Sequence, residues 1–94
     1  MFVISLTYQA SLDAIDAAIP AHMEWIRDGY DRGLFVASGR KEPRTGGMIF
    51  ALGDRETIER KLESDPFKLG GLATYDITEF LPLTVADGLE RLQQ

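Results

Sequence analysis

Cysteine is missing from this sequence of 94 residues, histidine occurs once, and long apolar runs are absent. The lack of cysteine excludes disulfide bonds, thiolate zinc sites and a cysteine nucleophile. No apolar run approaches the roughly 18 residues that a membrane-spanning helix requires. The opening stretch, MFVISLTYQA, lacks the basic residues with which a leader peptide begins. We therefore expect a soluble, cytoplasmic protein with no membrane partner.

Positive charge is also scarce, because 10 Lys and Arg residues stand against 15 Asp and Glu residues and give a net charge of -5. Nucleic-acid binding depends on clustered basic residues, so we expect no nucleic-acid partner. The charge is uneven, however, since Arg40, Lys41 and Arg44 are opposed only by Glu42 within residues 34–52. This local excess could attract an anionic substrate, although a solvated loop is the commoner explanation of such a stretch.

The composition is that of one small globular domain spanning residues 1–94, since 45% of the residues are hydrophobic. A domain of this size buries only about 60 to 65% of the surface that its unfolded chain exposes. Burial against a second copy would therefore add stability. Along the chain we expect a folded core over residues 1–82 and a C-terminal tail over residues 83–94.

Hydrophobic periodicity predicts four strands and two main helical regions. Ser11 is a suitable N-cap for the first helical region. Pro20 should interrupt that region and open a second helical segment, which ends near Gly33. The polar stretch RKEPRT should join the middle two strands as a hairpin. The expected strands are 2–8, 34–39, 46–53 and 72–80, and the other expected helices run from Asp54 to about Ser64 and over 84–94.

The element order β-α-β-β-α-β is that of the ferredoxin-like α+β fold, in which a four-stranded antiparallel sheet carries both helices on one face. The stretches LFVA at 34–37 and MIFAL at 48–52 are apolar at consecutive positions. Strands of that kind are covered on both faces, yet two helices cover only one. We therefore expect a homodimer whose sheets pack face to face and close toward a barrel. The alternative is that the C-terminal segment folds back over the open face.

The one histidine is the first candidate for a reactive group. His22 shares a helical stripe with Trp25 and Ile26, at i+3 and i+4, so it should face the sheet. On the second helix the same spacing runs from Leu62 to Asp65 and places a carboxylate at the end of the inward stripe. A carboxylate beside a buried imidazole fixes its tautomer and raises its basicity, and such a pair can act as a general base.

Each member of this pair also has an ordinary explanation. A histidine at such a position can be hydrogen-bonded to the backbone and inert, and Asp65 before Pro66 is a common N-cap of a short turn. No metal-ligand spacing such as H-E-x-x-H surrounds His22. Gly46-Gly47 is not followed by the Lys-Ser or Lys-Thr of a phosphate loop. We therefore expect neither a metal nor another cofactor.

Ser38-Gly39, at the end of the second strand, could complete a binding site. A hydroxyl and a backbone N–H beside an unhindered glycine can bind a carbonyl oxygen or an anion, but the same residues could merely open the hairpin. Arg40 and Arg44 are candidate ligands for an anionic substrate. The aromatic residues are numerous enough to line an apolar pocket, although aromatics at such spacings are usually core: Tyr8, Trp25, Tyr30, Phe35 and Phe67.

Several short motifs, taken in order, together resemble the YciI-like (YCII-related) family over about residues 1–82: Pro20-Ala21-His22, Ser38-Gly39, Gly46-Gly47 and Asp65-Pro66-Phe67. The resemblance implies a domain that dimerises into an α+β barrel, with His22 and Asp65 as the proposed active-site pair. It also implies kinship with muconolactone isomerases and chloromuconolactone dehalogenases, small enzymes that act on lactones. Family members often carry an arginine three residues before the histidine, where this chain has Ile19. If that arginine binds a substrate carboxylate, this protein binds a different group or uses Arg40 or Arg44 instead.

The leading functional hypothesis is a cofactor-independent enzyme that moves a proton at a carbon next to a carbonyl group. His22, oriented by Asp65, would move the proton, and Ser38 with the Gly39 N–H would hold the oxygen. A small lactone or cyclic carboxylate would suit, with Trp25 and Phe67 among its contacts. The alternatives are a non-catalytic small-molecule-binding or regulatory module and, by fold analogy alone, a cofactor-free oxygenase.

Overall fold

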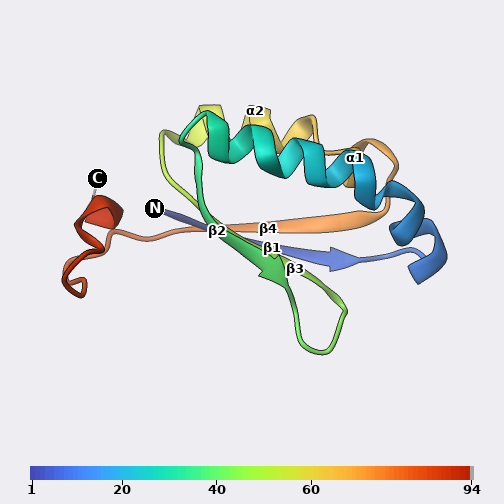
Figure 1. Ribbon diagram of the computed structural model, residues 1–94, viewed down its shortest axis with the longest axis horizontal. Helices are drawn as coiled ribbons and strands as arrows, with labels where there is room; N and C mark the ends of the chain where they lie inside the picture. Colours follow the sequence, from blue (N-terminus) through green and yellow to red (C-terminus); the bar gives the residue numbers. More distant parts are fainter. Residues whose placement is uncertain (94) are drawn as a thin grey trace.

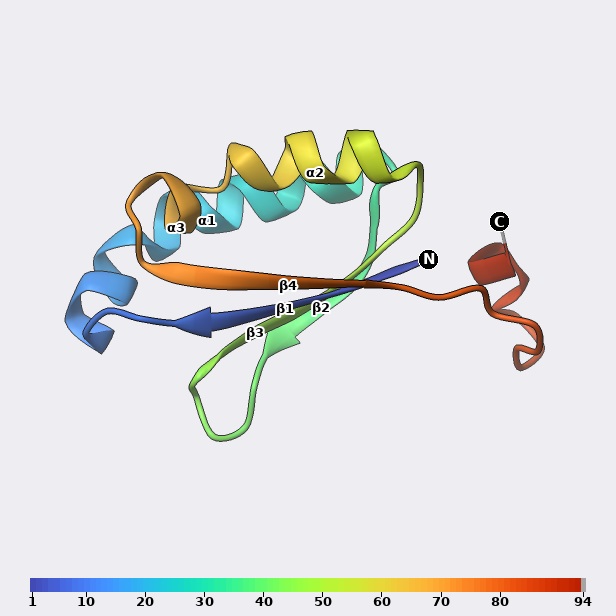
Figure 2. The same ribbon diagram turned by 180° about the vertical axis from the view of Figure 1, so that it is seen from behind.

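The computed structural model describes residues 1–93 and shows a four-stranded sheet with its helices on one face (Figure 1, Figure 2). The strand order is β2-β3-β1-β4, and every neighbouring pair is antiparallel. The ferredoxin-like α+β fold and the β2-β3 hairpin are thus confirmed. The elements are β1 (Phe2–Tyr8), α1 (Leu12–Asp31), β2 (Phe35–Arg40), β3 (Gly46–Ala51), α2 (Arg55–Glu63), α3 (Pro66–Leu69), β4 (Ala73–Glu79) and the 3-10 helix η1 (Glu90–Gln93).

Helix α1 is continuous, and the prediction that Pro20 divides it into two segments is wrong. Ser11 caps the helix as expected, because its hydroxyl accepts a hydrogen bond from the Ala14 N–H at 3.2 Å. A proline inside a helix removes one backbone hydrogen bond and costs about 3 kcal/mol. The helix continues because Ile15, before the proline, and Trp25, after it, are both buried in the same core. A break at the proline would draw one of them out of that core.

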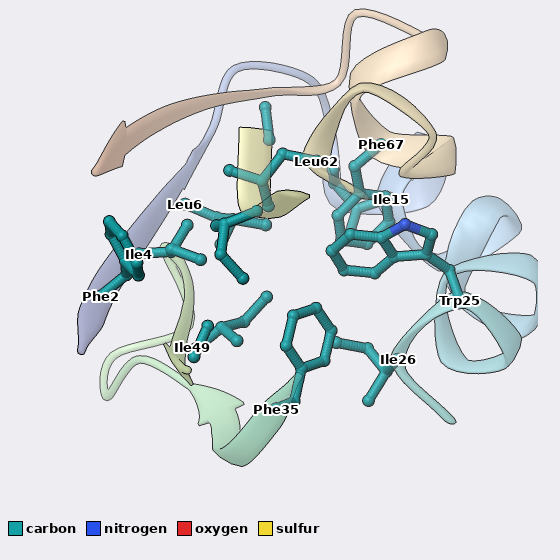
Figure 3. Packing of buried hydrophobic residues seen from close by; sticks show 13 residues of the cluster. Phe2, Ile4, Leu6, Ile15, Trp25, Ile26, Phe35, Ile49, Leu62 and Phe67 are labelled. Carbon is teal, nitrogen blue, oxygen red and sulfur yellow. The ribbon is translucent and has the colours of Figure 1, made fainter. Parts of the chain in front are cut away.

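The face of the sheet that meets the helices forms the core. On β1, Phe2, Ile4 and Leu6 alternate inward and are each exposed by 2% or less. Ala51 and Ile49, opposite the first two of these on β3, are equally buried. Figure 3 shows how the inward side chains of the sheet and the helices meet: Phe2, Ile4, Leu6, Ile15, Trp25, Ile26, Phe35, Ile49, Leu62 and Phe67.

The opposite face of the sheet is only partly apolar in the single chain, and the expectation that both apolar strands lie at the centre of the sheet is wrong. Strand β2 lies at the edge of the sheet rather than at its centre, and its Ala37 is exposed. On β3, Met48 and Phe50 point away from the helices, and Phe50 is 38% exposed. Val3 lies opposite Phe50 on β1 and is partly buried. The rest of this face, along β4, is polar: Thr74, Asp76 and Thr78.

The C-terminal segment runs past the end of the sheet and does not fold back over this face (Figure 2). Strand β4 ends at Glu79, one residue earlier than predicted. Of the helix expected over 84–94, only Glu90–Gln93 forms helical structure, as a 3-10 turn, and Gln94 lies outside the described residues. Within residues 1–93, no helix combines the length and the apolar character needed to cross a membrane.

Gly29 determines how closely α1 approaches β2. A Cβ atom at this position would lie 2.1 Å from Cδ2 of Phe35. The Phe35 ring cannot easily move aside, because it packs against Trp25 at a centroid distance of 5.3 Å and against Tyr30 at 6.2 Å. The glycine therefore lets the helix that carries His22 lie directly against the edge of the sheet.

We predict that Gly29→Ala lowers the free energy of unfolding by about 2 kcal/mol, measured by urea denaturation. Overpacking of this severity costs about 3 kcal/mol, and the better helix propensity of alanine recovers about 1 kcal/mol of that loss. The matched control is Gly39→Ala, whose Cβ would meet nothing within 4 Å. The free energy of unfolding of this control should stay within about 0.5 kcal/mol of the wild-type value. Equal stability of the two variants would contradict this account of the helix-sheet contact.

Candidate active site

His22 lies on α1 between two aromatic rings. The Phe67 ring stacks on the imidazole with a centroid distance of 3.9 Å and an angle of 6° between the planes. The Trp25 ring, almost one helical turn further along α1, lies at a centroid distance of 5.6 Å. The His22 side chain is 12% exposed. These contacts fix the plane of the imidazole and leave part of it accessible.

Asp65 lies between α2 and α3 and is completely buried. Its Oδ1 accepts hydrogen bonds from His22 Nδ1 at 2.8 Å and from the Phe67 N–H at 3.0 Å. The second of these bonds caps α3, in which Pro66 occupies the first turn. The interpretation of Asp65 as a partner of the imidazole and its interpretation as an N-cap therefore both hold.

Tyr75 is a third partner of this carboxylate, which the sequence analysis missed. It lies on the inward face of β4, opposite Leu6 of β1, and its hydroxyl donates to Asp65 Oδ2. Burial, and then the hydrogen bond to Asp65, hold the pKa of the Tyr75 hydroxyl well above its ordinary value of 10.0. A signal was present in the sequence, because Ala73, Tyr75 and Ile77 alternate on one face and a buried phenol needs a polar partner.

The hydrogen bonds to Asp65 determine which nitrogen of His22 is free. An ionised carboxylate only accepts hydrogen bonds, so Nδ1 must carry the proton that it donates. In the neutral ring the lone pair is then on Nε2, which makes no hydrogen bond within the described residues. His22 also lines a cavity of about 170 Å³, so Nε2 is the nitrogen left for a ligand.

This cavity lies between α1 and the β2-β3 side of the sheet and brings together most of the predicted site residues. His22, Ser38, Gly39, Arg40 and Phe67 all contribute to its lining. The remaining lining residues are mainly apolar, and sequence reasoning did not single out most of them for this role: Leu6, Tyr8, Ile19, Met23, Ile26, Gly47, Met48 and Ile49.

Of the predicted Ser38-Gly39 pair, the Ser38 hydroxyl is available as a hydrogen-bond donor to the cavity, whereas the Gly39 N–H is not. In the hairpin, the Lys41 N–H donates to the Gly46 carbonyl at 2.9 Å, and bonded pairs alternate along an antiparallel ladder. The pair formed by Gly39 and Met48 is therefore a bonded one, and its N–H points into the sheet. The Ser38 hydroxyl forms a hydrogen bond with the Tyr30 hydroxyl, 2.9 Å away. It can rotate to donate to a ligand instead.

Arg44 and Trp25, which were expected to contact substrate, are not part of the cavity lining. The Arg44 guanidinium donates to the Asp16 carboxylate on α1, and this contact raises the pKa of Arg44. Trp25 supports the imidazole from the side, and its Nε1 donates to the Lys61 carbonyl and to Ser64 Oγ, both at 3.0 Å. Both side chains are thus engaged in contacts within the chain.

A buried lysine holds Trp25 in place and was also missed. Lys61 of α2 is 4% exposed, and its Nζ donates to the Trp25 carbonyl at 2.9 Å and to Asp28 Oδ2 at 2.8 Å. The same ammonium group lies 4.6 Å from the Trp25 ring centroid. The helical spacing of Ile58, Lys61 and Leu62 could have indicated this position. Together these contacts fix α1 against α2 beside the imidazole.

The raised pKa of Tyr75 predicts a pH dependence of stability. Above about pH 10 the unfolded chain loses the Tyr75 proton while the folded chain keeps it, so this contribution is complete below pH 10 and declines as the pH rises. The difference in free energy of unfolding between the wild type and Tyr75→Phe should therefore shrink between about pH 9 and pH 11. Tyr30→Phe, at an exposed position, controls for the loss of a hydroxyl group. Both differences from the wild type, that of Tyr75→Phe and that of Tyr30→Phe, are measured by urea denaturation. The prediction fails if they change equally with pH.

Among solved structures, the chain is similar to 5-chloro-2-hydroxyhydroquinone dehydrochlorinase from Burkholderia phenoliruptrix AC1100 in complex with 2,5-dihydroxybenzoquinone, with a TM-score of 0.73. The similarity covers 84% of this chain and 91% of the dehydrochlorinase chain, at 16% sequence identity. At that identity the likeness shows a shared fold. No curated protein matches this chain.

The family model of the YCII-related domain matches residues 1–81. The matched part includes His22, the Ser38-Gly39 pair and the Asp65-Pro66-Phe67 motif, so it contains the whole of the candidate site. The resemblance stated from these motifs is thereby confirmed, and the chain belongs to the YCII-related family.

Proposed function

We propose that this protein is a cofactor-independent enzyme that transfers a proton at a carbon next to a carbonyl group, with His22 as the base and Asp65 as its positioning partner. The observation that supports this proposal is the 2.8 Å contact between His22 Nδ1 and a fully buried Asp65, at the wall of a cavity. A carboxylate in this position stabilises the imidazolium that forms when Nε2 takes a proton. A small lactone or cyclic carbonyl compound is the substrate class that suits the cavity.

The proposed reaction begins when Nε2 removes a proton from the carbon next to the carbonyl. The electron pair of the broken C–H bond moves to the carbonyl oxygen and gives an enolate, which the Ser38 hydroxyl stabilises by a hydrogen bond. The imidazolium then returns its proton to another carbon of the substrate, which completes an isomerisation. Alternatively, the electron pair of the enolate forms a C=C bond, a leaving group departs with the electron pair of its own bond, and the imidazolium gives its proton to that leaving group or to water, which completes an elimination. Neither route needs an oxidant or a reductant.

The dehydrochlorinase of the same fold holds a ligand of this chemical class. The molecule bound to it is a dihydroxybenzoquinone, a six-membered ring with carbonyl groups. Because the two chains share only 16% identity, we take from it the size and chemistry of a ligand that this fold can hold, not the reaction.

A second candidate function is a binding or regulatory module without catalysis. It is favoured by the structural use of Asp65, which caps α3 through the Phe67 N–H and holds β4 through the Tyr75 hydroxyl. A carboxylate needed for those contacts would orient His22 even if the imidazole moved no proton. Such a module would bind a ligand saturably and release it unchanged.

We further propose that two copies associate through the open face of the sheet. Val3, Met48 and Phe50 form the apolar part of this face, next to a shallow hollow that Ala37 and Gly39 also line. Burial of this area against a second copy would cover the largest exposed side chain of β3.

Phe50→Lys should therefore convert the dimer into a monomer in light scattering at micromolar concentration, because it places a charge in the proposed interface. Leu69→Lys, on α3 and away from this face, is the matched control at an apolar position that is 75% exposed. It should leave the dimer intact. A wild-type protein with the mass of one chain would refute the association.

His22→Asn tests the proposed chemistry. The amide nitrogen of asparagine can replace Nδ1 as the donor to Asp65, so the variant should fold, but it has no base in the place of Nε2. We expect the wild type to speed the exchange of carbon-bound hydrogen for deuterium in small lactones and cyclic diketones in heavy water, followed by NMR. The variant should lose that acceleration by about 100-fold or more.

Thermal unfolding of His22→Asn close to that of the wild type provides the folding control. If the wild type and the variant exchange deuterium at the same rate, His22 is not the base. If a compound binds saturably to the wild type and undergoes no exchange, the binding module is the better description.

A further inference from the structure

We infer that the cavity beside His22 binds a small organic anion built on a single ring, with Arg40 holding the anionic group. This inference deepens the proposed function and rests on it for the reaction, but binding can be measured without turnover. The anionic group would be a carboxylate or an enolate on the ring. Arg44, the other arginine considered for this role, is engaged with Asp16.

The first support is the charge of the cavity wall. Arg40 lines the cavity, and no Asp or Glu side chain of the described residues does so. Within residues 1–93, Arg40 forms no ion pair, whereas its neighbours are held elsewhere, Lys41 by Thr7 and Arg44 by Asp16. In a chain with a net charge of -5, this unpaired guanidinium is a local positive spot at the cavity. A guanidinium attracts an anion and can bind it through two parallel hydrogen bonds.

The second support is the position of Gly47. In the sheet register, Gly47 lies between Arg40 on β2 and Leu6 on β1, and all three residues line the cavity. Because glycine has no side chain, the floor between the cation and the apolar wall stays open. A ligand can therefore place its anionic group at Arg40 while its ring covers Gly47.

The third support is the volume of the cavity. It measures about 170 Å³, and a cavity of about 150 Å³ with apolar walls is known to bind one benzene molecule. Its walls are mainly apolar, including Ile26, Ile49 and Phe67. A single six-membered ring fits between these walls, whereas the second ring of a fused pair would extend through the open side of the cavity.

The arrangement also suits the proposed proton transfer. When Nε2 of His22 removes a proton from the ring, negative charge develops on the substrate. A guanidinium on the same cavity wall stabilises that charge in the transition state. Ile19 adds only an apolar contact, and Arg40 is the one Lys or Arg residue among the described residues that line the cavity.

The test compares benzoate with benzamide, which has the same ring and no charge, by NMR titration of the ¹⁵N-labelled protein. In the wild type, benzoate should cause saturable shifts at the cavity residues. Arg40→Gln should raise the Kd of benzoate by about tenfold or more and leave that of benzamide unchanged, because only the charged contact is lost. Arg44→Gln is the matched control and should change neither Kd by more than about twofold.

The size of the ligand is tested with 2-naphthoate, which carries the same anion on two fused rings and should bind the wild type no more tightly than benzoate, because its second ring lies outside the apolar walls. The inference is overturned if benzoate does not bind, if Arg40→Gln leaves its Kd unchanged, or if 2-naphthoate binds about tenfold more tightly than benzoate. His22→Asn should still bind benzoate. If deuterium exchange depends on His22 but not on Arg40, this inference is refuted and the proposed chemistry stands. If benzoate binding depends on Arg40 but no deuterium exchange occurs, the proposed chemistry is refuted and this inference stands.

Discussion

Asp65 is a carboxylate without contact to water, and its two oxygens receive hydrogen bonds from three different elements: α1 through His22, α3 through Phe67 and β4 through Tyr75. A buried carboxylate is costly unless hydrogen bonds replace its water shell. The three donors meet that requirement only when the helix layer is seated correctly on the sheet. The same contacts that hold α1, α3 and β4 together therefore also orient the imidazole, so fold and site chemistry depend on one residue.

The inward direction of His22 could be predicted because it follows from helical spacing, which the local sequence encodes. Asp65 was predicted on the same ground, yet α2 ends at Glu63, and Asp65 is buried as the N-cap of α3. The third partner could not be predicted with the same ease, because Tyr75 reaches Asp65 only after β4 pairs with β1. Pro20 shows the opposite relation, since a strong local signal for a helix break was overruled by the burial of Ile15 and Trp25 in one core. Local patterns thus predicted where helices and strands lie, whereas contacts between elements determine the partners of Asp65 and the continuity of α1.

The binding residues show the same limit. Arg40 and Arg44 were equivalent in sequence, and only the packing of the hairpin loop against α1 separates them by pairing Arg44 with Asp16. The Gly39 N–H is used in the hydrogen-bond ladder between β2 and β3, which follows from the register of the hairpin. That register could not be predicted from the residues alone. Among the residues that the structure describes, the groups that remain at the cavity are one cation without an ion pair, one adjustable hydroxyl and one imidazole nitrogen. These three groups suit an anionic carbonyl compound better than a neutral apolar ligand.

The central claim is that Asp65 holds the proton of the neutral imidazole on Nδ1 and leaves Nε2 open toward the cavity. Because the chain has a single histidine, ¹⁵N NMR of the labelled imidazole reports this directly, without assignment of other rings. In the neutral ring, the account predicts one tautomer, with a slowly exchanging proton on Nδ1 and a bare Nε2. A proton on Nε2, or a rapid average of the two tautomers, would contradict it.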